Sequence, residues 1–360
     1  MSIKPPRATI HDVAKLAGVS IKTVSRVLRQ EAKVSPATRA SVERAVREMA
    51  YQPDLSARSL KSNVPNTIGL VRSLEPGASP YQRAGHEYVM CLQVGALRAT
   101  QQLDFGLLLV PVHMQTAQAL REMQDRFERR QVAGYLVPAP VCDLPGLLDG
   151  LTEAQIPYAA INPNRENMDG QWVAAAEQCS AEALVSHLIA AGHKHIAYIS
   201  GAPESRASAQ REAGWRDALR KAGIIPAEGW IEPAGDFTFD AGRRSAHALF
   251  SRAQVPTAVF AASDNVAAGV MNAAHERGMR LPQDLSVVGF DDLELARKLW
   301  PKLTTVHIPF ESLGEIAARQ LVSHIQPLRL IEPKPSSQVI LHCDLVTRGS
   351  VAAPKSRQAF

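Results

Sequence analysis

Residues 20–29, SIKTVSRVLR, combine hydroxyl, basic and apolar side chains within a stretch short enough to form one helix. Lys22 and Arg26 can donate hydrogen bonds to the O6 and N7 atoms of guanine, and Ile21 can contact a thymine methyl group. Contacts to phosphate oxygens suit short hydroxyls and a further guanidinium, which are supplied by Ser20, Thr23, Ser25 and Arg29. This set indicates double-stranded DNA as a partner, provided that one helix presents the side chains together.

A second group of polar side chains follows apolar runs much later in the sequence. Asn162, Asp264 and Asp291 each end a run that is expected to form a strand. Ligands of parallel α/β sheets bind beyond the carboxyl ends of the strands, so these side chains predict a binding site. Because asparagine and aspartate are also common turn formers, a purely structural role is the alternative for each of them.

The positive charge of the chain is concentrated at its start. The 360 residues carry a formal charge of +5. Residues 1–63 contain 12 Lys/Arg and 5 Asp/Glu, whereas the remaining residues contain 28 and 30. A compact cationic segment on a near-neutral body is what binding to a phosphate backbone requires, although a solvated basic face without a partner has the same composition.

Capping residues and apolar spacing predict two short helices in this basic segment. Thr9 can cap a helix over residues 10–17, with Asp12 completing a capping box, and Gly18 can end it in the left-handed conformation. Ser20 then caps a second helix after a break of only two residues. Two helices joined by so tight a turn, with a glycine in it, are typical of a helix-turn-helix.

A third helix is expected to brace the other two. Ser35 can cap it, and Pro36 suits its first position. Its apolar residues at helical spacing, Val42, Ala45, Val46 and Met49, are expected to face the first two helices. In such a motif the second helix enters the major groove of DNA, and its early residues meet the base edges.

From residue 66 onward the sequence alternates apolar runs with amphipathic stretches such as 117–131 and 207–223. Short β-rich runs between helices predict βαβ units and parallel sheets. The expected strands are 67–71, 105–112, 134–139, 157–162, 195–201, 258–264 and 286–292.

Residues 9–28, TIHDVAKLAGVSIKTVSRVL, resemble the start of the lactose-repressor (LacI/GalR) family. The resemblance continues through VSPATRASVERAVREMAYQPDLSARSL to Leu60 and covers the rest of the chain to about Gly349. It implies a helix-turn-helix domain over residues 8–53, followed by a hinge helix and linker over residues 54–65. In this family the hinge helix orders on the operator and enters the minor groove, where an apolar wedge kinks the duplex.

The resemblance also assigns roles within the hinge. Leu60 matches the family's wedge leucine, Ala57 its small contact residue, and Lys61 a position that can reach the groove. Ile21 and Lys22 occupy the pair of positions at which family members differ, so the operator sequence is not transferable from a relative. The residues expected at DNA are Thr9, Ser20, Ile21, Lys22, Thr23, Ser25, Arg26, Arg29, Ala57, Leu60 and Lys61.

For residues 66–349 the resemblance implies a periplasmic-binding-protein-like body of two Rossmann-like subdomains, which binds an effector and carries the dimer contacts. REAGW (211–215) matches an R-x-x-G-aromatic motif whose arginine contacts the effector, and SVVGFDD (286–292) carries the ligand-facing aspartate. Phe237 lies where relatives place an aromatic ring. The expected effector residues are Tyr81, Tyr88, Asn162, Arg211, Phe237, Asp264 and Asp291.

An arginine and carboxylates around an aromatic face suit a neutral, polyhydroxylated ligand, because charged groups bond vicinal hydroxyls and a sugar packs on a ring. A sugar or sugar derivative is therefore the expected effector. Residues 73–89, SLEPGASPYQRAGHEYV, depart from the common form of this loop, and Tyr81 or Tyr88 would then supply a substitute contact. This departure leaves the identity of the ligand open.

The expected protein is an allosteric transcription regulator that binds a near-palindromic operator as a homodimer. The family favours a repressor, and an activator is the alternative within it. A cytoplasmic sugar-binding protein would explain the body without the basic segment, and a sugar-modifying enzyme would need a catalytic constellation that the sequence does not show. Eleven residues without leucine heptads follow Gly349, so we expect a disordered tail over 350–360 and a dimer rather than a tetramer.

No cofactor or metal site is expected. The four cysteines form no CxxC pair and are interpreted as buried thiols of a reducing compartment: Cys91, Cys142, Cys179 and Cys343. His193 and His195 match a structural turn rather than a metal pair. Residues 1–8 are basic but no apolar run follows them, so we expect neither a signal peptide nor a membrane span, and a cytoplasmic, nucleoid-associated protein.

Overall fold

The computed structural model divides the chain into two compact units, Met1–Val64 and Pro65–Phe360. It describes residues 8–28, 34–49, 51, 65–74, 86–164, 168–326 and 336–355. Residues 54–64 of the predicted hinge helix and linker lie outside the described residues, as do five predicted contact residues: Arg29, Ala57, Leu60, Lys61 and Tyr81.

The first unit contains three helices, α1 (Ile10–Ala17), α2 (Ile21–Leu28) and α3 (Pro36–Glu48). Their starts follow the predicted caps. Thr9 and Asp12 form a reciprocal capping box at α1, and the Ser35 side chain accepts a hydrogen bond at the start of α3. Gly18 ends α1 with φ of 66°, in the left-handed region that favours glycine. The predicted helix-turn-helix is therefore present.

Six apolar side chains from the three helices form a small core in this unit: Val13, Ala14, Val24, Val27, Val42 and Ala45. Each helix contributes two of them at helical spacing, so none of the helices could bury its apolar face alone. Val46 and Met49, which were expected to be buried, pack against this core while remaining partly exposed. The core fixes α2 by its inward face and leaves the outward face to meet a partner.

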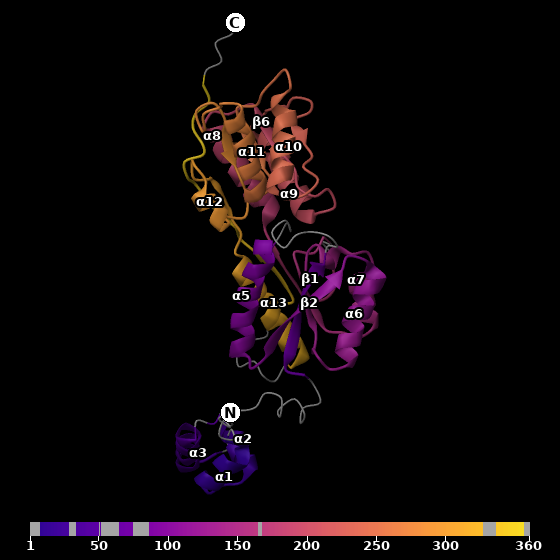
Figure 1. Cartoon of the computed structure of the whole chain (residues 1–360), viewed down its shortest axis with the longest axis vertical. Helices are drawn as coiled ribbons and strands as arrows, with labels where there is room; N and C mark the ends of the chain where they lie inside the picture. Colours follow the sequence, from indigo (N-terminus) through magenta and orange to yellow (C-terminus); the bar gives the residue numbers. More distant parts are fainter. Residues whose placement is uncertain are drawn as a thin grey trace, which may run out of the picture. The chain divides into compact units, whose positions relative to one another are not determined.

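The second unit, the body, contains two lobes (Figure 1). The first lobe is built on a six-stranded parallel sheet with the order β11-β5-β4-β3-β1-β2. Helices α6 (Thr116–Glu128) and α7 (Leu147–Glu153) cover one face, and α5 (His86–Gln102) and α13 (Phe310–Ile325) cover the other. Its strands are β1 (Thr67–Leu74), β2 (Gly106–His113), β3 (Tyr135–Pro138), β4 (Tyr158–Ile161), β5 (Trp172–Ala175) and β11 (Gln338–Leu341).

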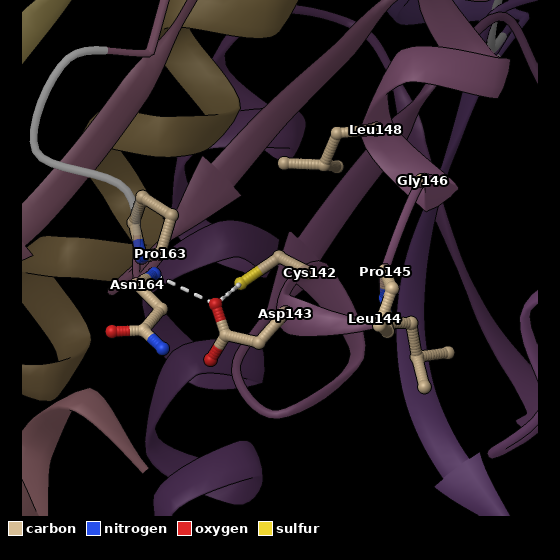
Figure 2. A pocket seen from close by; sticks show the side chains of 8 residues that line it. All are labelled: Cys142, Asp143, Leu144, Pro145, Gly146, Leu148, Pro163 and Asn164. Atoms are coloured by element: carbon tan, nitrogen blue, oxygen red, sulfur yellow. Dashed lines mark hydrogen bonds between the residues drawn. The ribbon is translucent and has the colours of Figure 1, made fainter. Parts of the chain in front are cut away.

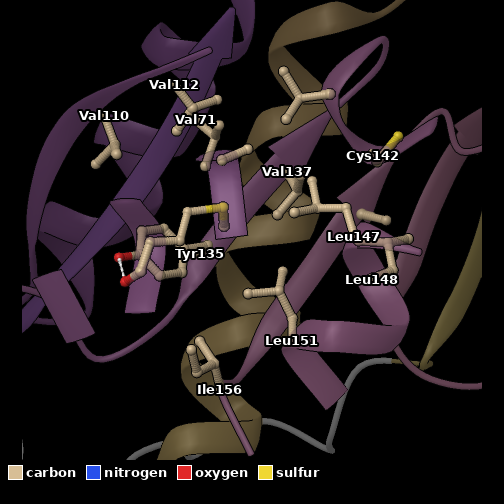
Figure 3. Packing of buried hydrophobic residues seen from close by; sticks show 14 of the residues in the cluster. Val71, Val110, Val112, Tyr135, Val137, Cys142, Leu147, Leu148, Leu151 and Ile156 are labelled. Atoms are coloured by element: carbon tan, nitrogen blue, oxygen red, sulfur yellow. Dashed lines mark hydrogen bonds between the residues drawn. The ribbon is translucent and has the colours of Figure 1, made fainter. Parts of the chain in front are cut away.

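The apolar core of the first lobe lies between its sheet and the pair α6 and α7 (Figure 3). Valines of β1, β2 and β3 pack against Leu147 and Leu151 of α7. Tyr135 is fully buried among them, and its hydroxyl donates a hydrogen bond of 2.7 Å to the Met123 carbonyl. Burying one large apolar side chain contributes about 1.5–3 kcal/mol, so this core holds the sheet rigidly beneath the loops at its carboxyl edge.

The second lobe contains a four-stranded parallel sheet with the order β7-β6-β8-β9. Helices α8 (Glu177–Ala190) and α9 (Arg206–Lys221) pack as one pair, and α10 (Phe239–Phe250) and α11 (Asp264–Glu276) pack as another. The short helix α12 (Glu294–Lys298) and the short helix η1 (Val141–Asp143) of the first lobe complete the helices of the body. The strands are β6 (Ile196–Ile199), β7 (Ile231–Glu232), β8 (Ala258–Ala261) and β9 (Ser286–Val288).

The chain crosses between the two lobes three times. It passes from β5 to α8, from β10 (Thr305–His307) to α13, and from β11 to β12 (Asp344–Val346). The antiparallel pair β10 and β12 therefore joins the second lobe to two of the crossings. In both sheets the order of strands reverses next to the first strand of the lobe, which is where open α/β sheets bind their ligands.

Each predicted strand is present, but five of them end earlier than predicted, and two of these end earlier by three residues or more. The run 258–264 stops at Ala261, and Asp264 is the first residue of α11 with Ser263 as its N-cap. The run 286–292 stops at Val288, although Asp291 still forms an isolated bridge with His307. Strands β5, β7, β10, β11 and β12 were not predicted, because they are short or lie on the crossings between lobes.

The prediction of a disordered tail from residue 350 is wrong for residues 350–355. Ser350 is buried and donates a hydrogen bond of 2.6 Å to the Val287 carbonyl. His193 bonds Thr257, Ser286 and the Ala352 carbonyl, so this histidine fastens the end of the described chain to the second lobe. Burial lowers the pKa of His193, which suits a structural role.

The cysteine prediction is partly wrong. All four cysteines are free, and Cys142 and Cys343 are buried, but Cys179 is exposed on α8. Within the described residues no group of three His, Cys, Asp or Glu side chains is arranged to hold a metal ion. In the same part of the chain no helix combines the length and apolar character that a membrane span requires.

Candidate functional site

Helix α2 presents two different faces. Val24 and Val27 are buried in the core of the first unit. Lys22 is exposed and Arg26 is partly exposed, whereas Ile21, also partly exposed, packs against that core. One short helix thus gathers the side chains that the sequence assigned to base edges.

The hydroxyl groups around α2 and α1 serve the helix ends. The Ser20 hydroxyl accepts a hydrogen bond of 3.1 Å from the Thr23 backbone N–H and lies 2.9 Å from the Thr23 hydroxyl. Thr9 donates both its backbone N–H and its hydroxyl to Asp12, and these bonds lower the pKa of Asp12. Thr9, Ser20 and Thr23 therefore hold the helices in place whatever else they contact, and their exposure leaves them accessible at the surface of the unit.

A buried charged cluster lies in the second lobe, centred on Arg211 of α9. Its Nε donates to Glu177 of α8 at 2.8 Å, and its Nη2 lies 3.1 Å from an oxygen of Asp291. Nη1 donates to the carbonyl of Ala262, at the end of β8. The three partners come from three elements of the lobe, so only the folded chain brings them together.

Two aromatic rings flank the guanidinium of Arg211. Its central carbon lies 4.2 Å from the centre of the Phe290 ring and 5.9 Å from that of Phe237. Phe237 in turn packs so closely on Gly201 that a Cβ atom there would lie 2.1 Å from the ring. A side chain at this point would have to displace the Phe237 ring, because the ring occupies the space of a Cβ atom. The predicted aromatic residue is thus placed beside the predicted arginine.

Asp291 occupies an unusual backbone position, with φ of 113°. Its backbone N–H donates to the Val306 carbonyl at 2.9 Å, which ties it to the crossing between β10 and α13. Burial raises the pKa of Asp291 to about 7, against the opposing effect of the Arg211 charge, and the nearby Glu177 and Glu87 carboxylates raise it further. A non-glycine residue with positive φ is strained, and such strain is common at functional sites.

Asp264 has a different place from the one expected. It has no exposed surface, and its two oxygens accept hydrogen bonds from the Leu293 backbone N–H at 2.7 Å and the Thr305 hydroxyl at 2.6 Å. Both bonds are internal to the lobe and hold the loop that carries Asp291. Asp264 was predicted to contact the effector directly. This prediction conflicts with the structure, because the side chain is buried and both carboxylate oxygens already accept hydrogen bonds from protein groups.

On the first lobe Asn162 follows β4 as predicted, with φ of 55°. Its side-chain oxygen accepts a hydrogen bond of 2.9 Å from the Ala175 backbone N–H. Tyr88 of α5 packs edge-on against Phe310, with ring centres 5.1 Å apart. Burial raises the pKa of Tyr88, and its hydroxyl lies near Asn162. These two side chains lie close together, while Tyr81 lies outside the described residues.

A small pocket of about 160 Å³ lies beside these residues, after β3 and β4 (Figure 2). Asp143 lies in its wall, where it accepts a hydrogen bond of 2.7 Å from the Asn164 backbone N–H. The Cys142 thiol lies 3.6 Å from the same carboxylate oxygen, and burial raises the pKa of Asp143. The charges of Cys142 and Asp143 also act on Tyr88, so the pocket and the tyrosine are close neighbours.

The sequence analysis missed Glu177, which is 2% exposed and is a direct partner of Arg211. It follows β5, a strand of four buried residues (WVAA) that was not predicted. The signal was available, because a glutamate directly after an apolar run is the same pattern that identified Asn162 and Asp291. Phe290 and the Ala262 carbonyl were missed for another reason. The residue type alone does not show that a ring will stack on a cation or that a backbone carbonyl will accept a hydrogen bond from it.

Comparison with known proteins agrees with this arrangement. Residues 9–54 match the family model of bacterial regulatory proteins of the lacI family, and residues 185–351 match a periplasmic binding protein-like domain. The chain is 35% identical over 352 residues to the HTH-type transcriptional repressor PurR of Erwinia tasmaniensis, covering 96% of this chain and 97% of the relative. The chain belongs to the LacI family.

Other relatives agree with this membership. The ribose operon repressor of Escherichia coli K12 is 32% identical over 318 residues, which is 88% of this chain and 93% of that protein. A lac repressor dimer bound to operator and the anti-inducer ONPF superposes with a TM-score of 0.74 at 27% identity, covering 97% of this chain and all of the other. The CelR–cellobiose complex gives a TM-score of 0.70 at 30% identity, covering 96% and 100%.

The expected fold and family are thus confirmed. The chain is a DNA-binding transcription regulator rather than an enzyme, because its relatives are repressors along nearly their whole length.

Proposed function

We propose that this protein represses genes for the use of a small polar metabolite, by binding an operator through α2 and releasing or tightening it when the body binds that metabolite. The observation that supports this is the pairing, in one chain, of a capped helix that exposes Lys22 and Arg26 with a buried charged and aromatic cluster around Arg211. A chain with either part alone would lack the other half of a switch. Because its relatives are DNA-binding repressors, we place the protein in the cytoplasm.

The effector is proposed to be a sugar or a sugar derivative. Hydroxyl groups suit the carboxylate of Asp291, and a ring such as Phe237 suits the apolar face of a sugar. Two relatives point in the same direction: one is named a ribose operon repressor, and the other is a complex with cellobiose. Coupling between the two ligands of such a switch is commonly about 1–3 kcal/mol, and it is reciprocal.

The protein is proposed to act as a homodimer on a near-palindromic site. Helix α5 carries three exposed apolar side chains at helical spacing: Met90 is 51% exposed, Val94 46% and Leu97 41%. A stripe of this kind on a regular helix suits a two-fold contact with a second copy. A lac repressor structure among the neighbours is a dimer on its operator. Trp300, 82% exposed on the second lobe, is a further apolar residue that such a contact can cover.

The test is selection of bound duplexes from a genomic fragment library by the full-length protein, followed by binding measurements on the enriched site at several salt concentrations. We expect one enriched near-palindrome, bound with a steep salt dependence. The same complex is then titrated with ribose, cellobiose and related sugars. A protein that enriches no sequence would be a ligand-binding protein and not a regulator.

The dimer is tested separately by sedimentation of the protein and of a Val94→Glu variant, with Val266→Ala in the buried core of the second lobe as a variant away from the stripe. We expect the glutamate to yield monomers and the core variant to remain a dimer. A monomeric wild-type protein would contradict the proposed dimer, and a dimer unaffected by the Val94→Glu substitution would place the contact elsewhere.

A further inference from the structure

We propose that Cys179 and Cys343 form a redox-sensitive pair, which hydrogen peroxide converts into an intramolecular disulfide beside two of the crossings between the lobes. Both cysteines are free thiols in the structure, so the disulfide is the oxidised form of the pair. This inference goes beyond the proposed function, because it concerns the two thiols and neither the ligand nor the operator.

The first observation is that both thiols lie against the first turn of α8. The Cys179 thiol donates a hydrogen bond of 3.4 Å to the carbonyl of Ala176, the residue directly before the helix. The Cys343 thiol lies within hydrogen-bonding reach of the Ala176 backbone and the Ser180 side chain. The Ser180 hydroxyl also donates to the Cys343 carbonyl at 3.3 Å, and Ser180 directly follows Cys179. A disulfide needs such proximity, because its two Cα atoms lie about 4.4–6.8 Å apart.

The second observation is that the two thiols differ in exposure. Cys179 is exposed, whereas Cys343 is 3% exposed. On either side of Cys343 the side chains of His342 and Asp344 are 79% and 76% exposed. Cys343 is thus a single buried residue in a surface segment. Peroxide reaches Cys179 directly, and Cys343 is available to a neighbouring group rather than to solvent.

The third observation is that the disulfide would leave no nearby carbonyl without a donor. The Ala176 carbonyl, which Cys179 would release, also accepts a hydrogen bond of 2.7 Å from the Ser180 hydroxyl. The Leu341 carbonyl lies 3.8 Å from the Cys343 thiol and also accepts from the Ala176 backbone N–H at 2.9 Å. A buried acceptor without a donor is destabilising, and the reaction creates none at these two carbonyls.

The reaction has two steps. The Cys179 sulfur attacks peroxide, the O–O bond breaks, and Cys179 becomes a sulfenic acid while hydroxide leaves and takes the thiol proton as water. The Cys343 sulfur then attacks the sulfenic sulfur, an S–S bond forms, the S–O bond breaks, and the second hydroxide leaves as water with the Cys343 proton. One peroxide is reduced and two thiols are oxidised.

The pKa of Cys343 suits this order of steps. Burial raises the pKa of Cys343 to about 11, and the nearby Glu177 carboxylate raises it further. The thiol is therefore protonated at neutral pH, and a protonated thiol is a poor nucleophile toward peroxide. Cys179 is the thiol that meets peroxide first, and Cys343 is the one that closes the disulfide.

The disulfide would join parts of the body that otherwise meet through hydrogen bonds. Cys343 lies between β11 and β12, and α8 begins directly after β5. The bond therefore fastens the third crossing to the helix that follows the first crossing. It also closes a long loop, which stabilises a fold chiefly by restricting the unfolded chain.

The alternative is that Cys179 reacts alone, by linking two copies of the chain or by accepting a low-mass thiol from solution. Both are ordinary reactions of an exposed cysteine. The shared contacts with Ala176 and Ser180 favour the internal partner, because a group held nearby reacts at a much higher effective concentration than one in solution.

The test treats the reduced full-length protein with an equimolar amount of hydrogen peroxide. The protein is then unfolded in guanidinium chloride with an alkylating reagent and digested without reduction, and the peptides are identified by mass spectrometry. We expect two of the four thiols to be lost and one linked pair of peptides that contains Cys179 and Cys343. We also expect the oxidised protein to melt at a higher temperature than the reduced protein, and dithiothreitol to reverse this.

Two variants test the order of steps, and a third is the matched control. Cys343→Ala should stop at the sulfenic acid, which dimedone traps on Cys179, and Cys179→Ser should leave Cys343 reduced. Cys91→Ala removes a thiol of α5 in the first lobe and should form the disulfide as the wild type does. Circular dichroism checks each fold, and the peptide map of the wild type decides the question if a variant does not fold.

Two results would overturn the proposal: a Cys343 that is still alkylated in the oxidised wild type, or a Cys179 linked to a second chain. A linked pair that melts no higher than the reduced protein would contradict the added restraint. None of these measurements uses DNA or the effector. Their failure would leave the proposed regulator standing, and a protein that binds no operator could still form the disulfide.

Discussion

Helix α2, which we propose to face DNA, and the Arg211 cluster, which we propose to face the ligand, are built in opposite ways. The side-chain hydrogen bonds that cap the starts of α1, α2 and α3 each join residues three positions apart. In the body, Arg211 bonds Glu177 34 positions away and Ala262 51 positions away. The first arrangement needs only a short stretch of chain and a small core, whereas the second needs a completed lobe.

In the first unit the side chains proposed for recognition differ from those that stabilise the fold. In the body the same side chains have both roles. Lys22 is exposed on α2, so its side chain is available to a partner and contributes little to the core. Arg211 is buried and compensates two carboxylates, so the residue that shapes the ligand site also holds the lobe together. Variants should therefore affect function alone in the first unit, and function together with stability in the body.

The largest expected effect follows the substitution Arg211→Ala. It leaves Glu177 and Asp291 buried without a cation, and breaking a buried pair in this way costs about 3–5 kcal/mol. Urea unfolding measures the loss of stability. Arg216→Ala removes an exposed pair on the same helix and should have no measurable effect. Equal stability of the two variants would show that the Arg211 cluster does not contribute to the free energy of unfolding.

Arg26→Ala should affect DNA binding but not folding. We expect a loss of about 1–3 kcal/mol in operator affinity and a relaxed preference at one base pair. Binding to a panel of single-base operator variants measures both. A uniform loss over all sequences would instead identify Arg26 as a phosphate contact, and an unchanged melting temperature would confirm that the unit is intact.

The titration of Asp291 predicts a pH dependence of stability. Its pKa in the folded protein is raised to about 7, so the folded state binds the proton more tightly than the unfolded chain. The sign follows: stability falls as the pH rises through 7, by about 1 kcal/mol between pH 6 and pH 8. Asp291→Asn should flatten this dependence. Parallel profiles of variant and wild type would mean that another group titrates.

Gly201→Ala should give the smallest effect on stability and still disturb the ligand site. The new Cβ would lie 2.1 Å from the Phe237 ring, so the ring must move away from Arg211. Because a side-chain ring can rotate, we expect a loss of stability of about 1 kcal/mol or less. Titration of the operator complex with effector should then show a weakened response. Gly235→Ala, where nothing lies nearby but φ is 86°, separates the contact from backbone strain.

The sequence predicted the three described helices of the first unit and their starts. Thr9, Gly18, Ser20 and Ser35 act where they were expected, because caps depend on neighbours a few residues away. In the body the strands were found but their ends were not. Asp264 was assigned to a strand end, yet Ser263 caps a helix there, and a cap after a buried strand has the same residue types as a strand-end turn.

The ligand site was predicted in part. Arg211, Phe237 and Asp291 were identified and lie together, whereas Glu177 was missed because the strand before it was not recognised. The assignment of Asp264 to the ligand conflicts with hydrogen bonds that the residue type could not predict. Its oxygens are bound by Leu293 and Thr305, which come from other parts of the lobe.

The sequence by itself determined the three capped helices, the concentration of positive charge in residues 1–63 and the alternation of strands and helices in the body. These features depend on local hydrogen bonds and on the period of apolar residues, both of which are written along the chain. Tertiary structure alone decided how Arg211 is used. Which charges meet in a buried site depends on where distant segments are folded, and burial then sets which of those charges a ligand can reach.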